Sequence, residues 1–323
     1  GDGGNTLNAS LFVGARTLDN PLPFAIVAVD RHVAGGSLHG AFRMTRLPWP
    51  VRLGGGIDAQ RQVDDRLNFE NCAALAITAP ATTLCPRPGT ERGTIRLNQQ
   101  ERVGGLGGYV RAEVEAPHRL FASAALRYDR VNFAVRDRFI TATNLNDSGE
   151  RVLSAVSPML GISWRARPLV SVYANVSTAF ETPTITELTN QDNGAAGLNA
   201  LLEPQRTRTA EVGVQGMFWS RLRADVALFR ATVLDELVPF DVPNQPGRRA
   251  FRNAGRTSRQ GVETNLNTST SVFDIGVAHT WSRFAFDTYR VGAANYDGKV
   301  IPGTPAHLLQ AYVTARRAGW FAT

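Results

Sequence analysis

The chain has 323 residues, 43% of them hydrophobic, with 35 Lys and Arg against 28 Asp and Glu. This hydrophobic fraction excludes disorder along the whole chain. The longest nearly apolar stretch, 21–29, is far shorter than the roughly 20 residues of a transmembrane helix. The basic residues are 34 Arg and one Lys, spread along the whole chain, whereas a nucleic-acid-binding surface concentrates its charge. Composition therefore argues against a helical membrane protein and against nucleic-acid binding.

Apolar and polar residues alternate along most of the chain, which predicts β-strands with one apolar and one polar face. Between 170 and 180, for example, Val170, Val172 and Val176 share one face, while Ser171 and Asn175 lie on the other. We predict about fourteen strands, in chain order near 7–16, 24–33, 36–46, 51–62, 97–115, 119–137, 151–165, 169–180, 204–218, 221–238, 250–267, 272–286, 305–316 and one beginning at Gly319.

The lengths of strands and loops favour a membrane barrel over a soluble β-sandwich. Many alternating segments have nine or more residues, the length of a membrane-spanning strand, whereas strands of soluble sheets have about 5–6. Short links at 116–118, 166–168, 220 and 268–271 take turns with long ones at 138–150, 181–203, 239–249 and 287–304. Outer-membrane barrels have short turns on one side and long loops on the other. The expected fold is all-β: a transmembrane antiparallel up-and-down β-barrel.

Two cysteines, Cys72 and Cys85, lie thirteen residues apart in a segment that contains Pro and Thr. The spacing favours one disulfide bond that closes a loop in an oxidising compartment, and the alternative is two unrelated thiols. Neither a CxxC pair nor a nearby histidine indicates a zinc site.

Signatures of catalysis are missing from the sequence. It contains no G-x-S-x-G, P-loop or H-E-x-x-H pattern, and the acidic pair Asp64–Asp65 has no histidine beside it. The five histidines are far apart in sequence, which favours structural roles over metal binding. We therefore expect no enzyme, no catalytic residue, no bound metal and no cofactor.

Several segments together resemble TonB-dependent outer-membrane receptors. They follow one another in the order and at the spacing of that family's barrel strands, from about Glu101 to Phe321 and more weakly from Leu11 to Asn71. The segments are the Leu126–Asp129 strand, Tyr173–Leu188 with Phe180, Pro183 and the pair Glu187–Leu188, then Leu198–Gln205 with Glu211 and Gly213, then Asn253, Gly255, Gly261 and Glu263, and finally Ile301–Pro305.

The resemblance implies a barrel of roughly 22 strands around a folded plug in the Gram-negative outer membrane. Such receptors import scarce nutrients, usually ferric siderophores, with energy from the TonB complex, which grips a segment N-terminal to the barrel. No plug and no such segment precedes Leu7, and the chain stops at Thr323 in the first residues of a strand. We therefore expect residues 1–323 to be a partial barrel of about fourteen strands that contacts TonB through a region it lacks.

The ligand is less well determined. The interval 189–197 has no histidine, although haem receptors of the family carry an iron-binding histidine there, so a ferric siderophore or a similar iron chelate is favoured. Such chelates are commonly anionic and would be attracted by arginine. Arg61, Arg66, Arg87 and Arg111 are the candidate ligand-binding residues. The alternative for each is an ion pair with an acidic residue that only solvates the wall.

Two other classes of protein remain open on the sequence. One is a passive, porin-like outer-membrane channel, and the other is a soluble β-sandwich binding module. A plug sequence upstream would separate the receptor from the porin, and dependence on detergent would separate either barrel from the sandwich.

Overall fold

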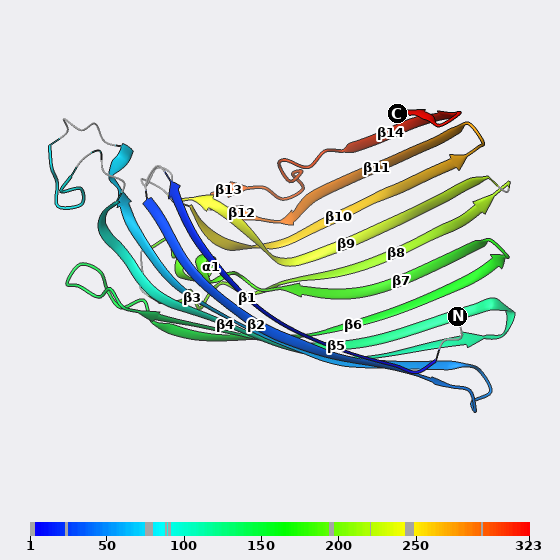
Figure 1. Ribbon diagram of the computed structural model, residues 1–323, viewed down its shortest axis with the longest axis horizontal. Coiled ribbons are helices and arrows are strands. Elements are labelled where there is room, and N and C mark those ends of the chain that lie inside the picture. The colour runs from blue at the N-terminus through cyan, green and yellow to red at the C-terminus, as the bar shows by residue number, and fades with distance from the viewer. Residues whose placement is uncertain are drawn as a thin grey trace.

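The computed structural model describes residues 4–22, 25–74, 80–87, 89, 92–193, 197–219, 221–242, 249–291 and 293–323. Its main element is one antiparallel sheet of 13 strands whose order follows the chain (Figure 1). The strands of this sheet are β1 (Thr6–Leu22), β2 (Ala25–Met44), β3 (Val51–Asn71), β4 (Arg92–Ala116), β5 (Leu120–Asp137), β6 (Gly149–Arg167), β7 (Val170–Glu181), β8 (Gln205–Phe218), β9 (Leu222–Asp241), β10 (Arg249–Ser269), β11 (Phe273–Thr288), β14 (His307–Arg317) and β15 (Trp320–Ala322).

The remaining elements are small and lie in links between strands. They are the 3-10 turns Cys72–Ala74 and Pro117–Arg119, the helix α1 (Ile185–Thr189), and the two-stranded sheet of β12 (Arg290–Val291) and β13 (Ala294–Asn295). Within the described residues no helix has the length and apolarity to cross a membrane.

The sheet is strongly curved, so that it forms a trough with one concave face (Figure 1). In the described part of the chain, β1 pairs only with β2 and β15 only with β14, which leaves these two strands as open edges. A single continuous sheet excludes a sandwich, which needs two sheets packed face to face. The predicted antiparallel up-and-down barrel architecture is confirmed, and it is present as a partial barrel.

Most short turns and long links lie at opposite ends of the strands, although β1 and β2 are only two residues apart at the long-link end. The turns at 45–50, 117–119, 168–169 and 270–272 are at one end, and the links at 138–148, 182–204 and 289–306 are at the other (Figure 1). In barrels of this kind the long loops are extracellular. The predicted link at Ser220 lies outside the described residues, and β9 continues to Asp241 into the predicted 239–249 link, of which 243–248 are also outside them.

The prediction of two strands over 24–33 and 36–46 is wrong, because β2 is one strand of 20 residues. The gap between the two predicted strands, at 34–35, is paired instead, and both Gly35 and Gly36 pair with β1 and β3 in an unbroken register. Glycine fits at these positions because atoms of the neighbouring strands lie very close to its backbone. A Cβ atom on Gly35 would lie 2.6 Å from the Phe12 ring and 2.7 Å from the backbone oxygen of Ala59.

This close approach makes Gly35 a sensitive position in the sheet. We expect Gly35→Ala to destabilise the barrel by about 1–3 kcal/mol, because the Ala59 carbonyl belongs to a paired strand and cannot move freely. Gly104→Ala is the matched control, since no atom lies within 4 Å of the Cβ position there. The temperature at which the folded barrel unfolds in gel-shift assays measures the effect. Equal unfolding temperatures for the two variants would contradict it.

The two faces of the sheet differ in polarity, as the alternation predicts. Large apolar side chains are exposed on the convex face, among them Leu106, Val110, Leu126, Leu160, Val176, Val212 and Leu228. The other face carries the ion pairs described below. An apolar exterior around a polar interior is the pattern of a strand sheet that faces lipid outward and water inward.

Candidate ligand-binding lumen

The inner wall formed by β2 and β3 carries an ion pair with a buried carboxylate near its long-loop end. Arg31 donates two hydrogen bonds to Asp64, from Nε at 2.9 Å and from Nη2 at 2.6 Å, and Gln62 donates a third at 3.0 Å. The Asp64 side chain is only 3% exposed. Because a buried carboxylate needs such partners, this pair belongs to the structure of the wall.

A second ion-pair cluster lies further toward the turns. Arg127 donates to both carboxylate oxygens of Asp58, at 2.9 and 3.0 Å, and also to Asp129, at 2.6–2.9 Å. It therefore links β3 to β5 across β4, where Gly107 leaves room. A Cβ atom on Gly107 would lie 2.1 Å from the Arg127 guanidinium. Because Asp58 and Asp129 both accept hydrogen bonds from Arg127, this arginine also belongs to the structure of the wall.

Arg66 is held less completely than these two arginines. Its Nη1 lies 3.3 Å from Glu101 Oε1 and donates to Thr186 Oγ1 at 3.3 Å, while Nε lies 3.4 Å from Asn68 Oδ1. Glu101 accepts a shorter hydrogen bond from Gln99, whose Nε2 donates at 2.6 Å. These long, single contacts contrast with the two-pronged bonds of Arg31. Arg66 thus retains donor capacity for an anion.

Thr186 reaches Arg66 because the link 182–204 folds back onto the sheet. Its helix α1 begins with a capping box: Glu187 N donates to the Thr184 hydroxyl at 3.3 Å, and Thr184 N donates to the Glu187 carboxylate at 2.7 Å. Asn199 N then donates to the Leu188 carbonyl at 2.7 Å. These bonds give a five-residue helix a fixed shape that propensity alone would not provide.

A small apolar cluster fastens this link to the sheet. Ile185, Leu188 and Leu202 pack against residues of β5 and β6, namely Phe133, Val135 and Leu153. Arg151 of β6 adds polar contacts, since it donates to the Asn199 carbonyl and, at 3.1 Å, to Glu203. The loop is therefore docked on the inside of the trough at its long-loop end, where it narrows the entrance to the lumen.

The structure separates the four arginines chosen from the sequence. Arg111 lies opposite Gly54, twelve residues before Arg66 on β3, so the two side chains are about 40 Å apart along the strand. Arg111 pairs with Glu113 near the turns. Arg87 is exposed in the segment that carries Cys85. Arg111 therefore lies far from Arg66, and Arg66 contacts the docked loop through Thr186.

Arg61, a candidate chosen for its place near the longest loop, lies on the outer face of the sheet. It is nine residues from Arg52 on β3, and an odd number of steps reverses the side of the sheet. Its neighbours on that face are Ala34 of β2 and Gly104 of β4. Parity along the predicted strand 51–62 already contained this signal.

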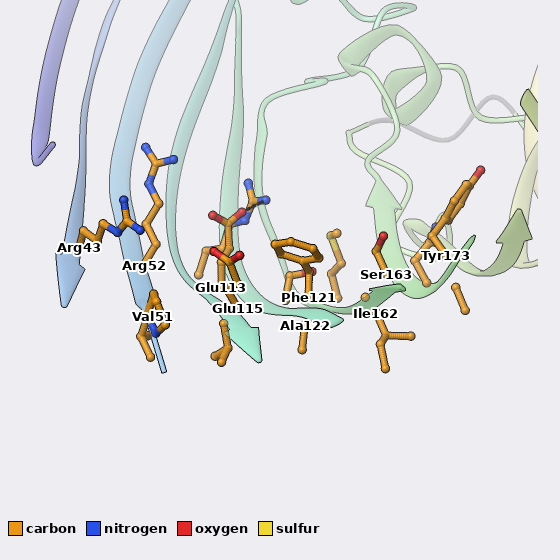
Figure 2. A pocket seen from close by; sticks show the side chains of 18 residues that line it. Arg43, Val51, Arg52, Glu113, Glu115, Phe121, Ala122, Ile162, Ser163 and Tyr173 are labelled. Carbon is orange, nitrogen blue, oxygen red and sulfur yellow. Dashed lines mark ion pairs between the residues drawn. The ribbon is translucent and has the colours of Figure 1, made fainter. Parts of the chain in front are cut away.

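A cavity of about 540 Å³ lies at the turn end of the wall. In Figure 2 Arg52, Phe121 and Tyr173 point to one side of the sheet, whereas Val51 and Ile162 point to the other. The figure thus shows directly that successive side chains point to opposite faces of the sheet. The cavity combines Arg43, Arg52 and the Arg111–Glu113 pair at the end of the strands away from the docked loop.

Cys72 and Cys85 are joined by a disulfide bond, with their Cα atoms 5.6 Å apart. Both are buried. The bond closes the link between β3 and β4, whose residues 75–79, 88, 90 and 91 lie outside the described part. The Thr94 amide of β4 donates to the Leu84 carbonyl at 2.9 Å. The residue next to Cys85 is therefore also bonded to a strand of the sheet.

A further extracellular cluster was not anticipated from the sequence. In the 289–306 link Asp297 accepts hydrogen bonds from Tyr289 N at 2.8 Å and from Arg290 at 3.2 Å. These bonds keep the pKa of Asp297 below its usual value. Tyr289 stacks on Phe286, with ring centroids 4.9 Å apart, and burial raises the pKa of its phenol. Across the described residues no group of three or more metal-ligating side chains is assembled.

The chain matches the family model for the β-barrel of TonB-dependent receptor-like proteins over residues 3–322. It therefore belongs to that family, and the resemblance drawn from its motifs is confirmed. The polar inner wall, the apolar exterior and the docked extracellular loop described above are features of such a barrel.

Solved structures share the fold. The unliganded ferric citrate transporter FecA matches 99% of this chain with a TM-score of 0.75 at 15% identity, over 45% of its own length. The siderophore receptor PiuA from Acinetobacter baumannii matches 96% with a TM-score of 0.68 at 16% identity, over 49% of its length. The copper transporter OprC matches 98% with a TM-score of 0.71 at 16% identity, over 48%. The chain thus spans somewhat less than half the length of these proteins.

Proposed function

We propose that this chain is the barrel portion of an outer-membrane receptor that takes up a ferric siderophore or a similar iron chelate with energy from TonB. The observation that carries the proposal is the docked loop 182–204, which brings Thr186 to Arg66 at the entrance of the lumen. A passive channel needs an open lumen, whereas a receptor needs a shaped entrance that contacts its ligand.

The choice of an iron chelate draws on charge and on the related folds. Two of the three similar structures carry names of ferric citrate and siderophore uptake, while the third is a copper transporter. At 15–16% identity these proteins support the fold and leave the ligand to experiment. Arg66, with donor capacity beyond its Glu101 contact, supports an anionic ligand over a bare metal cation.

Growth under iron limitation tests the proposal. A strain that lacks the parent gene is complemented with the full-length gene and supplied with single ferric chelates, or with limiting copper. We expect restored growth on at least one anionic ferric chelate, and loss of that growth when TonB is deleted. Growth that persists without TonB would indicate the porin-like alternative, and restoration by copper alone would overturn the iron proposal.

A further inference from the structure

Two histidines on neighbouring strands of the sheet are in direct contact. His279 Nε2 of β11 and His307 Nδ1 of β14 lie 3.2 Å apart, and the two rings stack with their centroids 5.5 Å apart and their planes at 16°. In the described part of the chain no other histidine contacts a second one. The two residues are 28 positions apart in sequence, so only the pairing of β11 with β14 reveals them as a pair.

The strand register fixes the positions of both side chains. His307 begins β14 directly opposite Trp281 of β11, and His279 is two residues before Trp281, so the two histidines are diagonal neighbours on one face. Beside them the Ser282 amide donates to the Ala306 carbonyl at 2.9 Å. Side chains that are held on paired strands keep their separation better than side chains on loops.

The pair lies on the outer face, away from the lumen. Strand alternation places His279 on the same face as Ile275, and His307 on the same face as Leu309 and Val313, and these three apolar residues are exposed. Trp281, which is 37% exposed, shares this face, and tryptophan is typical of the interface between membrane and water. The histidine contact is itself exposed, so an ion can reach it from solvent.

Neither ring is tied to an acidic side chain. The residues opposite His279 are Thr264 of β10 and Leu309 of β14, which carry no charge. Within the described residues neither His279 nor His307 forms an ion pair. Both imidazoles therefore remain available as ligands.

The separation of the two nitrogens fits two ligands of one metal ion. Bonds of about 2.0–2.1 Å to a tetrahedral or square-planar ion place neighbouring ligand nitrogens about 2.9–3.4 Å apart. The observed 3.2 Å lies within that range. In the hydrogen bond one of the two nitrogens carries a proton and the other a lone pair. Both present lone pairs when each ring carries its proton on its other nitrogen, and an ion can then take the place of the shared proton.

We propose that His279 and His307 bind one divalent ion of a late first-row transition metal, with Cu²⁺ bound most tightly and water completing its coordination. Imidazole is a ligand of Cu²⁺, Ni²⁺ and Zn²⁺, and affinity within this series is highest for Cu²⁺. The bound ion links β11 to β14 where the 289–306 link re-enters the sheet. Because the site is on the face opposite the lumen, it goes beyond the proposed uptake function and does not depend on which nutrient is imported.

The test uses the full-length receptor, purified in detergent without a histidine tag and freed of metal with a chelator that is then removed. Titration with Cu²⁺ chloride measures affinity, and electron paramagnetic resonance identifies the coordinating imidazole nitrogens. We expect the wild type to bind one Cu²⁺ through two imidazoles. H279Q and H307Q should each lose one imidazole from the spectrum and bind Cu²⁺ about tenfold or more weakly, because half of the protein ligands are gone.

The matched control is His32→Gln. His32 is an exposed histidine of β2 whose neighbour is Asp30, at 3.8 Å, rather than a second histidine, so its replacement should leave Cu²⁺ affinity and the spectrum unchanged. Mg²⁺ should not compete with Cu²⁺, since it prefers oxygen ligands. Hydrogen exchange gives an independent readout: Cu²⁺ should slow exchange of the Ser282 amide in the wild type and leave it unchanged in H307Q.

Several results would overturn the proposal. One is wild-type Cu²⁺ affinity in H279Q or H307Q variants that fold, as judged by their heat-dependent gel shift. A second is a wild-type spectrum with nitrogen from one imidazole only, and a third is an equal loss of affinity in H32Q. Exchange at Ser282 that ignores Cu²⁺ would reject the link between the two strands. Growth on ferric chelates is a separate readout, so failure of the proposed nutrient leaves this test unaffected.

Discussion

Replacing Leu188 with alanine is expected to release the 182–204 loop from the inner wall. Leu188 is 0% exposed and packs with Ile185, Leu202 and residues of β5 and β6. Truncation of a buried leucine costs about 2–5 kcal/mol, a large amount for a link held by one small apolar cluster. Hydrogen exchange should show faster exchange at the Leu188 and Asn199 amides, whose bonds close the loop.

The chain offers a close control for this change. Leu201 belongs to the same loop, but it is 87% exposed, so Leu201→Ala removes the same atoms without opening a cavity. It should leave exchange rates in the loop unchanged. The barrel strands should exchange as in the unaltered protein in both variants. Equal protection of the loop in Leu188→Ala and Leu201→Ala would show that the apolar cluster does not hold it.

Changing Arg66 to glutamine is expected to weaken the binding of an anionic ferric chelate by about tenfold or more, because a hydrogen bond to a charged group is worth about 1.5–3 kcal/mol. The opposite change tests whether the charge itself acts on the ligand. Glu101→Gln removes the carboxylate beside Arg66 while keeping its shape, so affinity should stay the same or increase. Titration of the purified full-length receptor with the chelate measures both.

Arg61→Gln is the control for Arg66→Gln. The two residues share β3, but Arg61 faces outward, so its neutralisation should leave chelate affinity unchanged. If Glu101→Gln and Arg66→Gln both weaken binding, Arg66 only braces the wall through its ion pair. If Arg61→Gln weakens chelate binding as much as Arg66→Gln, the loss of affinity does not come from a contact in the lumen.

The sequence predicted much of the fold because strand alternation is a local property. The faces of β7 and β8 follow from residues two apart, and the unequal lengths of the links indicated which end carries the loops. The predicted break between 33 and 36 was wrong, and the glycines at 35–36 could not have decided it, since glycine permits a turn and also permits close packing within a strand. Only the neighbouring strands, through Phe12 and the Ala59 backbone, distinguish these two uses.

The candidate site was less accessible from the sequence. Arg66 was a candidate because of its place near the longest loop, and its partners Glu101 and Thr186 lie 35 and 120 residues away. Their contact depends on the β3–β4 register and on the docking of α1. Arg61 could have been assigned to the outer face by counting from Arg52.

The sequence by itself therefore determined the class of this protein: long amphipathic strands, their turns, and the family motifs in order. These depend on residues close together along one strand, where the side-chain period fixes the face. The tertiary structure decided which arginines are neutralised and that the 182–204 loop docks inside. Each of these depends on cross-strand register and on long-range packing, which no local pattern specifies.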